Sequence, residues 1–425
     1  MMMDPTHVMK ECATTRCCIA GGGPAGMVLG FLLARAGVDV LVLEKHADFL
    51  RDFRGDTIHP STLEVLYELG LLDEFLQRPH QEFTQVGARI EDFAVTIGDF
   101  SHLPTHCKFI ALMPQWDFLN FLAEKAKRYP QFHLRVEAEV IELIEEDGRV
   151  AGVRAKTPQG ILEVRADLVI GADGRHSTVR KQAALEVIDR GAPIDVLWMR
   201  ITRQPSDPDE TLGNFRAGKL LVTINRGDYW QCAYVIPKGG SDTIHQNGLP
   251  AFRESIATAA PFLRGRVDGI KSWDDVKLLT VAVDHLRNWS RAGLLCIGDA
   301  AHAMSPVGGV GINLAIQDAV ATANILTPSL TKPSTQQSLH TAIDNTLRNV
   351  QQRREYPTRM TQAVQVFLHK RLLGPALGNV TPIRRLPLPL KLLQQFPVLR
   401  RIPARVVGLG FRPEHVQTQA STSEK

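Results

Sequence analysis

Three glycines near the N-terminus have the spacing of a loop that holds a phosphate group. The segment Gly21-Gly-Gly23-Pro-Ala25-Gly26 fits the pattern GxGxxG. In such a loop the first glycine permits a tight turn, the second lets the backbone approach a pyrophosphate, and the third allows helix and strand to pack closely. The N-terminus of the following helix then faces the anion. The chemistry that this spacing predicts is dinucleotide binding.

An acidic residue downstream narrows the choice of nucleotide. Glu44 lies 18 residues after Gly26, at the end of the apolar segment 38–44. An acid at the end of the second strand bonds the adenosine ribose and disfavours a 2′-phosphate. These residues by themselves leave both NAD and FAD open.

Two later segments repeat the arrangement of an apolar run that ends in an acid beside a glycine. They are residues 168–177, which contain Asp173-Gly174, and residues 294–302, which contain Gly298-Asp299. A glycine-rich loop with the sequence PVGGVGIN follows at 306–313. Its glycines let backbone N–H groups approach a ring, and the helix that begins there points its positive end at the same place.

Together these segments resemble the class A flavoprotein monooxygenases, the p-hydroxybenzoate-hydroxylase-like enzymes, and within them the ubiquinone-biosynthesis hydroxylases. The resemblance covers residues 15–330. It implies FAD as the tightly held cofactor, NAD(P)H as a transient reductant and molecular oxygen as a co-substrate. In this family a flavin hydroperoxide hydroxylates an aromatic or other apolar small molecule, so the cofactor carries the chemistry and no catalytic side chain is assigned.

The resemblance also implies roles for individual residues. Glu44 holds the adenosine ribose, Arg54 reaches the flavin phosphates, Gln115 bonds near the ribityl chain, and Asp299 binds a ribityl hydroxyl. Arg54 could instead be a surface ion-pair partner, and Gln115 a polar residue at a helix end. Asp173 belongs to a signature associated with both FAD and nicotinamide, and the sequence does not decide between them. The expected cofactor-binding residues are Gly21, Gly23, Ala25, Gly26, Glu44, Arg54, Gln115, Asp173, Asp299, Gly311, Ile312 and Asn313.

Fewer residues mark a substrate site. Residues 219–237 read as a strand pair that turns at Arg226-Gly-Asp, in the region that faces the substrate in relatives. No arginine–tyrosine cluster that would clamp a carboxylate is evident, which predicts a neutral or apolar substrate. An FAD-dependent dehydrogenase or double-bond reductase without oxygen insertion, or a redox-silent flavin protein, stays open as an alternative. The candidate substrate residues are Thr223, Asn225, Gln231 and Pro306, and His302 is expected to be a structural hydrogen-bonding residue.

The elements that must position these residues can be read from the apolar spacing. Residues 16–44 predict strand, helix and strand, with Gly37 ending the helix. Residues 61–69 predict a helix with a Ser61–Glu64 capping box and Gly70 as its stop. Residues 186–283 have a strand-like pattern. The expected fold is therefore α/β: a Rossmann-type FAD-binding domain (15–80, 105–185 and 284–345), an inserted sheet-rich substrate domain (81–104 and 186–283), and a C-terminal helical extension (346–425).

Composition indicates which partners, metals and cellular compartment to expect. The net charge of +4 hides a basic C-terminal segment, because residues 353–412 carry twelve Lys or Arg and one acid. A helical cap that packs on the flavin domain is the expected role of this segment, and peripheral membrane contact through 353–412 is the alternative. No recognition motif or stacking aromatic residues accompany the charge, so no nucleic-acid partner is expected. The six cysteines lack metal-site spacing, and with no signal-peptide pattern we expect a cytoplasmic protein without a metal.

Overall fold

The protein is mixed α/β, as the sequence predicts. The computed structural model describes residues 9–50, 57–208, 212–332, 335–374, 377, 383 and 385–421. Its largest sheet has the strand order β19-β20-β11-β1-β2-β8, with β10 and β9 attached to β11. These strands are β1 (Met9–Ala20), β2 (Val40–Leu43), β8 (Phe132–Arg135), β9 (Glu139–Glu146), β10 (Arg149–Thr157), β11 (Gly160–Gly171), β19 (Ser290–Arg291) and β20 (Leu294–Cys296).

The core of this sheet is parallel, and this decides where the sequence motifs meet. β1 lies between β11 and β2, and β20 pairs with the other edge of β11. Ala20 is opposite both Gly171 and Leu43, and Gly171 is opposite Cys296. Because parallel strands end at the same edge, the loops that follow all four strands leave the sheet side by side.

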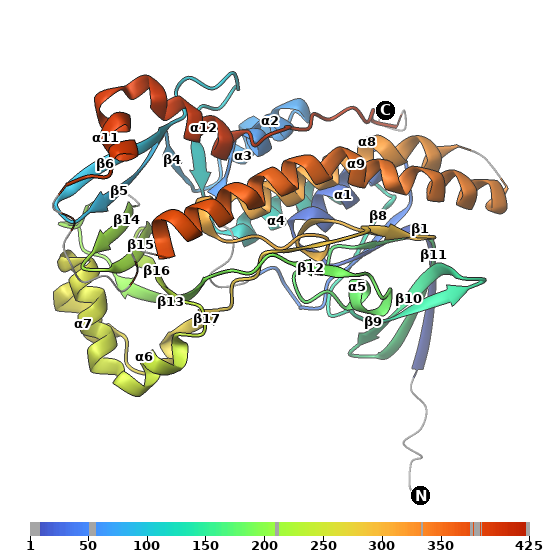
Figure 1. The fold of residues 1–425 in the computed structure, drawn as a ribbon. Coiled ribbons are helices and arrows are strands. Elements are labelled where there is room, and N and C mark those ends of the chain that lie inside the picture. The colour runs from blue at the N-terminus through green and yellow to red at the C-terminus, as the bar shows by residue number, and fades with distance from the viewer. Residues whose placement is uncertain are drawn as a thin grey trace, which may run out of the picture.

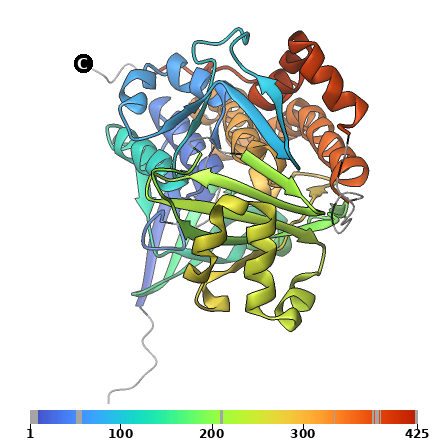
Figure 2. The ribbon, with the colours of Figure 1, turned by 90° about the vertical axis from the view of Figure 1, so that its left-hand side faces the viewer.

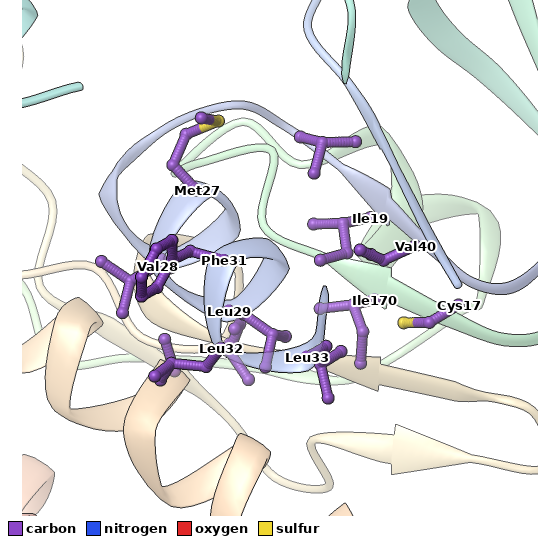
Figure 3. Close-up of a cluster of buried hydrophobic side chains, with 14 of the residues drawn as sticks. Cys17, Ile19, Met27, Val28, Leu29, Phe31, Leu32, Leu33, Val40 and Ile170 are labelled. Carbon is purple, nitrogen blue, oxygen red and sulfur yellow. The ribbon is translucent and has the colours of Figure 1, made fainter. Parts of the chain in front are cut away.

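Helices cover the sheet in layers (Figure 1). Helix α1 (Pro24–Arg35) follows β1 and is buried along nearly its whole length, with Met27, Phe31 and Leu32 among its core side chains (Figure 3). It ends where Gly37 adopts a φ of +85°, as expected from the sequence. Helix α1 packs against α4 (Gln115–Ala126) and α8 (Val310–Thr331), and α8 packs against the long helix α9 (Gln336–Leu368).

A second, largely antiparallel sheet has the order β17-β13-β16-β15-β14-β5-β6. It joins strands from residues 85–99 with strands from residues 194–279, although the boundaries of a separate substrate domain stay a prediction. Helices lie against one of its faces (Figure 2). Its strands are β5 (Gln85–Ile90), β6 (Phe93–Asp99), β13 (Ile194–Thr202), β14 (Leu212–Arg216), β15 (Lys219–Asn225), β16 (Tyr229–Pro237) and β17 (Lys277–Leu279).

The strand-like interpretation of residues 186–283 is wrong for its second half. Residues 241–269 form α6 (Ser241–Asn247), α7 (Leu249–Ala259) and a 3-10 segment, η1 (Pro261–Gly269). The apolar positions Phe252, Ile256 and Leu263 are spaced for a helix and pack on the sheet around Trp230. The prolines and glycines that suggested turns stand instead at the ends of these helices.

Smaller elements complete the frame around the sheet edge. Helix α2 begins one residue earlier than expected, at Pro60, and no capping box forms, because Ser61 then lies inside the helix and not at its N-cap; Glu64 bonds His106. Proline is favourable at the first helical position since its missing N–H would be unpaired there. These elements are α2 (Pro60–Glu68), α3 (Leu72–Leu76), the sheet β3 (Thr57–Ile58), β7 (Ile110–Leu112) and β4 (Gln81–Phe83), α5 (Thr178–Gln182), and the pair β12 (Val187–Asp189) and β18 (Asp284–Leu286).

The C-terminal segment is largely helical, as expected, and it packs on α8 and on β6 of the second sheet. Helix α9 runs without a break through residue 345, where the FAD-binding domain was expected to end and the C-terminal extension to begin. It continues as the π-helical turn η5 (His369–Leu373). Helices α11 (Leu388–Gln395) and α12 (Arg401–Gly408) pack on β6 (Figure 1). Among the residues that the structure describes, no helix has the length and apolar character needed to cross a membrane.

Candidate active site

The first loop and the two acid–glycine motifs come together at the carboxyl edge of the parallel sheet. A side chain at Gly21 would place its Cβ 2.4 Å from the carbonyl oxygen of Ala172 and 2.9 Å from the Cα of Asp173. A Cβ at Gly298 would lie 3.2 Å from the Cβ of Ala25. A side chain at Gly21 would clash with the second motif, and one at Gly298, where φ is +58°, would be strained and tight against the first loop, so the three motifs adjoin one another.

The GxGxxG loop has the shape of a phosphate cradle. A Cβ at Gly26 would stand 2.0 Å from the carbonyl oxygen of Gly21, so helix and turn touch there. A Cβ at Gly23 would meet no atom within 4 Å, which leaves open space in front of the α1 N-terminus. The unpaired N–H groups of the first helical turn point into that space and suit a pyrophosphate.

Glu44 is aimed at the same loop. Its carboxylate is buried and accepts hydrogen bonds from the backbone N–H of Gly22 and of His46, each at 3.0 Å. These two bonds orient the carboxylate toward the loop, where an acid can accept a hydrogen bond from a ribose hydroxyl. The arrangement therefore fits the adenosine end of FAD.

The carboxylate of Asp299 is accessible to solvent, whereas the carboxylate of Asp173 is occupied by hydrogen bonds within the protein. Asp299 lies in the short turn η3 (Gly298–Ala300); its side chain is 34% exposed, and its carboxylate is 3.7 Å from the guanidinium of Arg175. Asp173 accepts hydrogen bonds from the Ser177 hydroxyl and the Val179 N–H, and burial raises its pKa. These bonds hold the start of α5, so Asp173 has a structural role, and its contact with a cofactor stays a prediction.

The loop at the start of α8, residues 306–313, packs against β3, the strand that precedes α2. A Cβ at Gly309, where φ is +62°, would lie 2.3 Å from the Thr57 hydroxyl oxygen. The buried Asn313 side chain accepts bonds from the N–H of His59 and the hydroxyl of Thr62 and donates to the carbonyl of Thr57. Since this amide is used internally, the group left to meet a flavin at Asn313 is its backbone.

The remaining expected residues lie in different surroundings. Gln115 opens α4 and is half-buried, as is Pro306, which precedes the turn η4 (Val307–Gly309). A Cβ at Gly311 would meet no atom within 4 Å, so the first turn of α8 faces open space at Gly311, while the neighbouring Ile312 packs against the main core. Arg54 lies outside the described residues. His302 is buried against Asp318, in keeping with a structural role.

The structure separates the candidate substrate residues onto two faces of the second sheet. Thr223 is opposite Cys232, and Asn225 is opposite Trp230, so both point toward the side covered by α7 and η1. Gln231 points to the other side, because side chains alternate along a strand. Of the three residues chosen on these strands, only Gln231 faces the flavin loop.

Side chains that sequence reasoning missed share that face with Gln231. Val307 of the flavin loop packs against a cluster that contains Ala233 and Val235, and the partly buried Trp198 packs against the same cluster. Arg200 is the cross-strand neighbour of Gln231. Strict alternation along residues 229–237 was the signal that could have separated the two faces. We call the side chains of Trp198, Val222, Gln231, Ala233 and Val235 the inner sheet face.

Helix α9 holds the loop between the flavin site and the inner sheet face. The Gln365 side chain accepts from the N–H of Ser305 and donates to the carbonyl oxygens of Ser305 and Val307, at 3.2, 2.9 and 3.0 Å. The Ser305 hydroxyl and the buried His369 ring nitrogen Nε2 are 2.9 Å apart. No local sequence signal connects residues about 60 positions apart, so this support was not foreseen.

Known proteins share both the motifs and the fold. The family of FAD binding domains matches residues 14–355. The 6-methylpretetramide 4-monooxygenase of Streptomyces rimosus is 34% identical over 404 residues, which cover 93% of this chain and 92% of that protein. The chain belongs to the class A flavoprotein monooxygenases.

Two further proteins are similar to this chain at lower sequence identity. The rifampicin monooxygenase of Streptomyces venezuelae is 29% identical over 308 residues, 71% of this chain and 61% of that protein. The structure of the anhydrotetracycline hydroxylase OxyS from Streptomyces rimosus has a TM-score of 0.69 at 22% identity and covers 93% of this chain and 76% of that one. The latter match establishes a common fold.

The site fits FAD, the cofactor of this family. When bound, FAD accepts hydride from NAD(P)H and activates oxygen. The features of the chain that suit this cofactor are open space at Gly23 and at Gly311, an oriented carboxylate at Glu44, and an accessible one at Asp299. The N-terminus of α8 has a positive electrostatic potential, which would stabilise negative charge on a reduced ring bound beside it.

Proposed function

We propose that this monooxygenase hydroxylates a neutral, fused-ring aromatic molecule. The observation that carries the proposal is the inner sheet face, where Trp198 and Val307 of the flavin loop both pack against the cluster that contains Ala233 and Val235. An apolar surface of this kind favours a flat apolar ligand, and the indole of Trp198 offers such a ligand ring-stacking contacts. The name of the relative at 34% identity, a 6-methylpretetramide 4-monooxygenase, supports the same substrate class.

Polar groups at one end of the inner sheet face could orient such a molecule. Gln231 and Arg200 are adjacent across β13 and β16, and the Gln231 side-chain oxygen accepts a bond from Arg226. The Arg200 guanidinium lies 5.0 Å from the centre of the Tyr229 ring. We propose Gln231 and Pro306 as substrate contacts. Thr223 and Asn225 point away from the flavin loop, and the geometry offers them no support.

We further propose that FAD is held by the residues gathered at the sheet edge. The first loop would bind the pyrophosphate, Glu44 the adenosine ribose, and Asp299 a ribityl hydroxyl. Gln115 and the backbone of the first α8 turn would meet the ribityl chain and the ring. The short approaches of Gly21 and Gly298 to neighbouring motifs support a single continuous site.

The proposal is tested by flavin reduction and by oxygen labelling. Fused-ring phenols and single-ring phenols are compared as accelerators of anaerobic flavin reduction by NADH and by NADPH, since substrate accelerates this step in the family. Turnover under ¹⁸O₂ with the accelerating compound should place one labelled oxygen atom in the product. Substrate oxidation without label would favour a dehydrogenase, and acceleration by single-ring compounds alone would contradict the fused-ring assignment.

We also propose peripheral contact with an anionic membrane through a patch on α11 and α12. This C-terminal patch comprises five large apolar side chains, each at least 38% exposed: Leu388, Leu392, Phe396, Val398 and Ile402. Exposed cations accompany them, including Lys391, Arg401 and Arg405, and residues 356–412 contain no acid. Apolar side chains surrounded by cations suit the interface of an anionic bilayer. Such contact would give an apolar substrate a route from lipid to the site.

A further inference from the structure

A buried carboxylate on α8 connects the third flavin motif to the C-terminal segment. Asp318 is fully buried. Its Oδ2 atom accepts a hydrogen bond from the N–H of Gly298 at 3.1 Å and lies 2.5 Å from Nε2 of His302. Its Oδ1 atom accepts a bond from Nε of Arg354 at 2.9 Å. Three elements distant in sequence therefore meet at one side chain.

These contacts hold both ends of the turn that carries Asp299. The turn closes through bonds from the N–H groups of Ala301 and His302 to the carbonyl oxygen of Gly298, each at 2.9 Å. Asp318 bonds the backbone N–H of Gly298, the first residue of this turn, and the imidazole ring of His302, the last residue. The direction of the Asp299 side chain follows from the turn, because Asp299 is its second residue.

The carboxylate is held ionised by its partners. Burial alone would raise the pKa of Asp318, but His302 and Arg354 outweigh that effect and keep it below its usual value. Arg354 is also fully buried and bonds Glu414 and the carbonyl oxygen of Arg412. A buried charge without a partner is strongly destabilising, so the group is stable only when α8, α9 and residues 412–414 are all in place.

We propose that Asp318 is a positioning residue for FAD, which fixes the Gly298–His302 turn so that Asp299 meets the ribityl chain. The proposal rests on the proposed role of Asp299. It makes flavin affinity dependent on Arg354 and the C-terminal segment, which lie at the end of the family match or beyond it. No direct contact between Asp318 and FAD is required.

Another aspartate provides a closely matched control for removing the charge. Asp207 is also buried as a side chain and accepts bonds from an arginine (Arg266), a ring N–H (Trp230) and a backbone N–H (Gln204). Asp207→Asn and Asp318→Asn therefore remove the same kind of interaction. Arg266 and Trp230 belong to the α7–η1 side of the second sheet, away from the flavin motifs.

The experiment measures the FAD dissociation constant of each apoprotein together with its unfolding temperature. We expect both variants to lose stability, but only Asp318→Asn to lose affinity for FAD, by roughly tenfold or more, as when one charge-assisted hydrogen bond is lost. We also expect its bound flavin to show a shifted visible spectrum. Equal affinities in Asp318→Asn and Asp207→Asn would overturn the proposal.

Two further variants keep the test decisive. If Asp318→Asn fails to fold, Asp318→Asn combined with Arg354→Met removes both charges of the buried pair, and it should fold and still bind FAD weakly. A folded double variant with parental affinity would also overturn the proposal. Asp299→Ala tests the underlying site separately: if it retains full affinity, the assignment of Asp299 fails, whereas a loss only in Asp299→Ala contradicts the role of Asp318.

Discussion

At the scale of single residues, Asp299 combines accessibility with a fixed backbone. Its carboxylate reaches the surface of the site, while the glycine before it is anchored to Asp318. We expect Asp299→Ala to weaken FAD binding about ten- to a hundredfold, because a hydrogen bond to an ionised carboxylate contributes roughly 1.5–3 kcal/mol. Fluorescence titration of the apoprotein measures the change. Asp274→Ala, at an exposed aspartate of the second domain, should bind FAD like the parent.

His59 makes the free energy of unfolding sensitive to acid. The ring is fully buried, its Nδ1 lies 2.8 Å from the carbonyl oxygen of Val407, and burial lowers its pKa from 6.5 to about 4. The unfolded chain therefore binds a proton below pH 6.5 that the folded chain does not bind until about pH 4. Stability should fall as pH falls through this window, by roughly 3 kcal/mol for this residue.

The variant His59→Asn isolates this effect. Its side-chain N–H can replace the Nδ1 donor to Val407, but it cannot titrate. Urea unfolding at pH 7.5 and at pH 4.5 should show a smaller loss of stability in the variant than in the parent. Other buried histidines, His285 and His369, also have lowered pKa values, so the difference between the proteins is the quantity to compare. Identical pH profiles would mean that His59 does not contribute.

At the scale of elements, α9 determines where the flavin loop sits. Gln365 makes three hydrogen bonds to Ser305 and Val307, and Val307 contacts the inner sheet face. We expect Gln365→Ala to lower the amount of product formed per NAD(P)H oxidised by several-fold, because a small displacement of the loop misplaces substrate relative to the ring. Affinity for FAD should change little, since Gln365 does not contact the GxGxxG loop or the Asp299 turn.

Product yield and NAD(P)H consumption, measured together, test this prediction. Gln352→Ala provides the control, because Gln352 lies on the same helix with an exposed side chain. It should retain the parental ratio of product to NAD(P)H. An unchanged ratio in Gln365→Ala would show that the loop keeps its position without α9.

At the scale of the whole molecule, the C-terminal segment has two distinct surfaces. Its inner side is structural, since Arg354 and Glu414 are buried with Asp318. Its outer side carries the C-terminal patch. The two surfaces need separate tests, because truncation after Arg348 would cut α9 and remove Arg354 along with the patch.

Substitutions on the outer side alone test membrane contact. We expect Leu388→Ser, Phe396→Ser and Ile402→Ser together to reduce co-sedimentation with anionic vesicles, while FAD affinity stays at the parental level. Binding of the parent should weaken with salt, because each basic residue near an anionic surface contributes about 1 kcal/mol at low salt. The control triple variant replaces exposed apolar residues elsewhere: Ile141, Val187 and Leu278. If the parental protein does not co-sediment with anionic vesicles at low salt, the proposed membrane contact is excluded.

The sequence by itself determined the cofactor class and the strand–loop segments that meet at one edge of the parallel sheet. An apolar strand followed within a few residues by Gly21, Asp173 or Asp299 is a local pattern, and each such segment folds as the pattern predicts. The parallel order of these strands then brings the motifs to one edge without further information. FAD, the family and the α/β class could all be derived from such local signals, because glycine spacing and apolar runs specify backbone geometry directly.

Only the tertiary structure decided which side chains share a face of the second sheet and which distant side chains hold the loops of the site in place. Thr223 and Gln231 lie on adjacent strands, yet the alternation of the sheet turns them to opposite faces. Asp318, Gln365 and Arg354 gain their roles from partners that are between 16 and 60 residues away. A buried polar side chain is stable only beside its partners, and long-range packing supplies those partners. Composition and periodicity describe neighbours along the chain and therefore contain no record of these pairs.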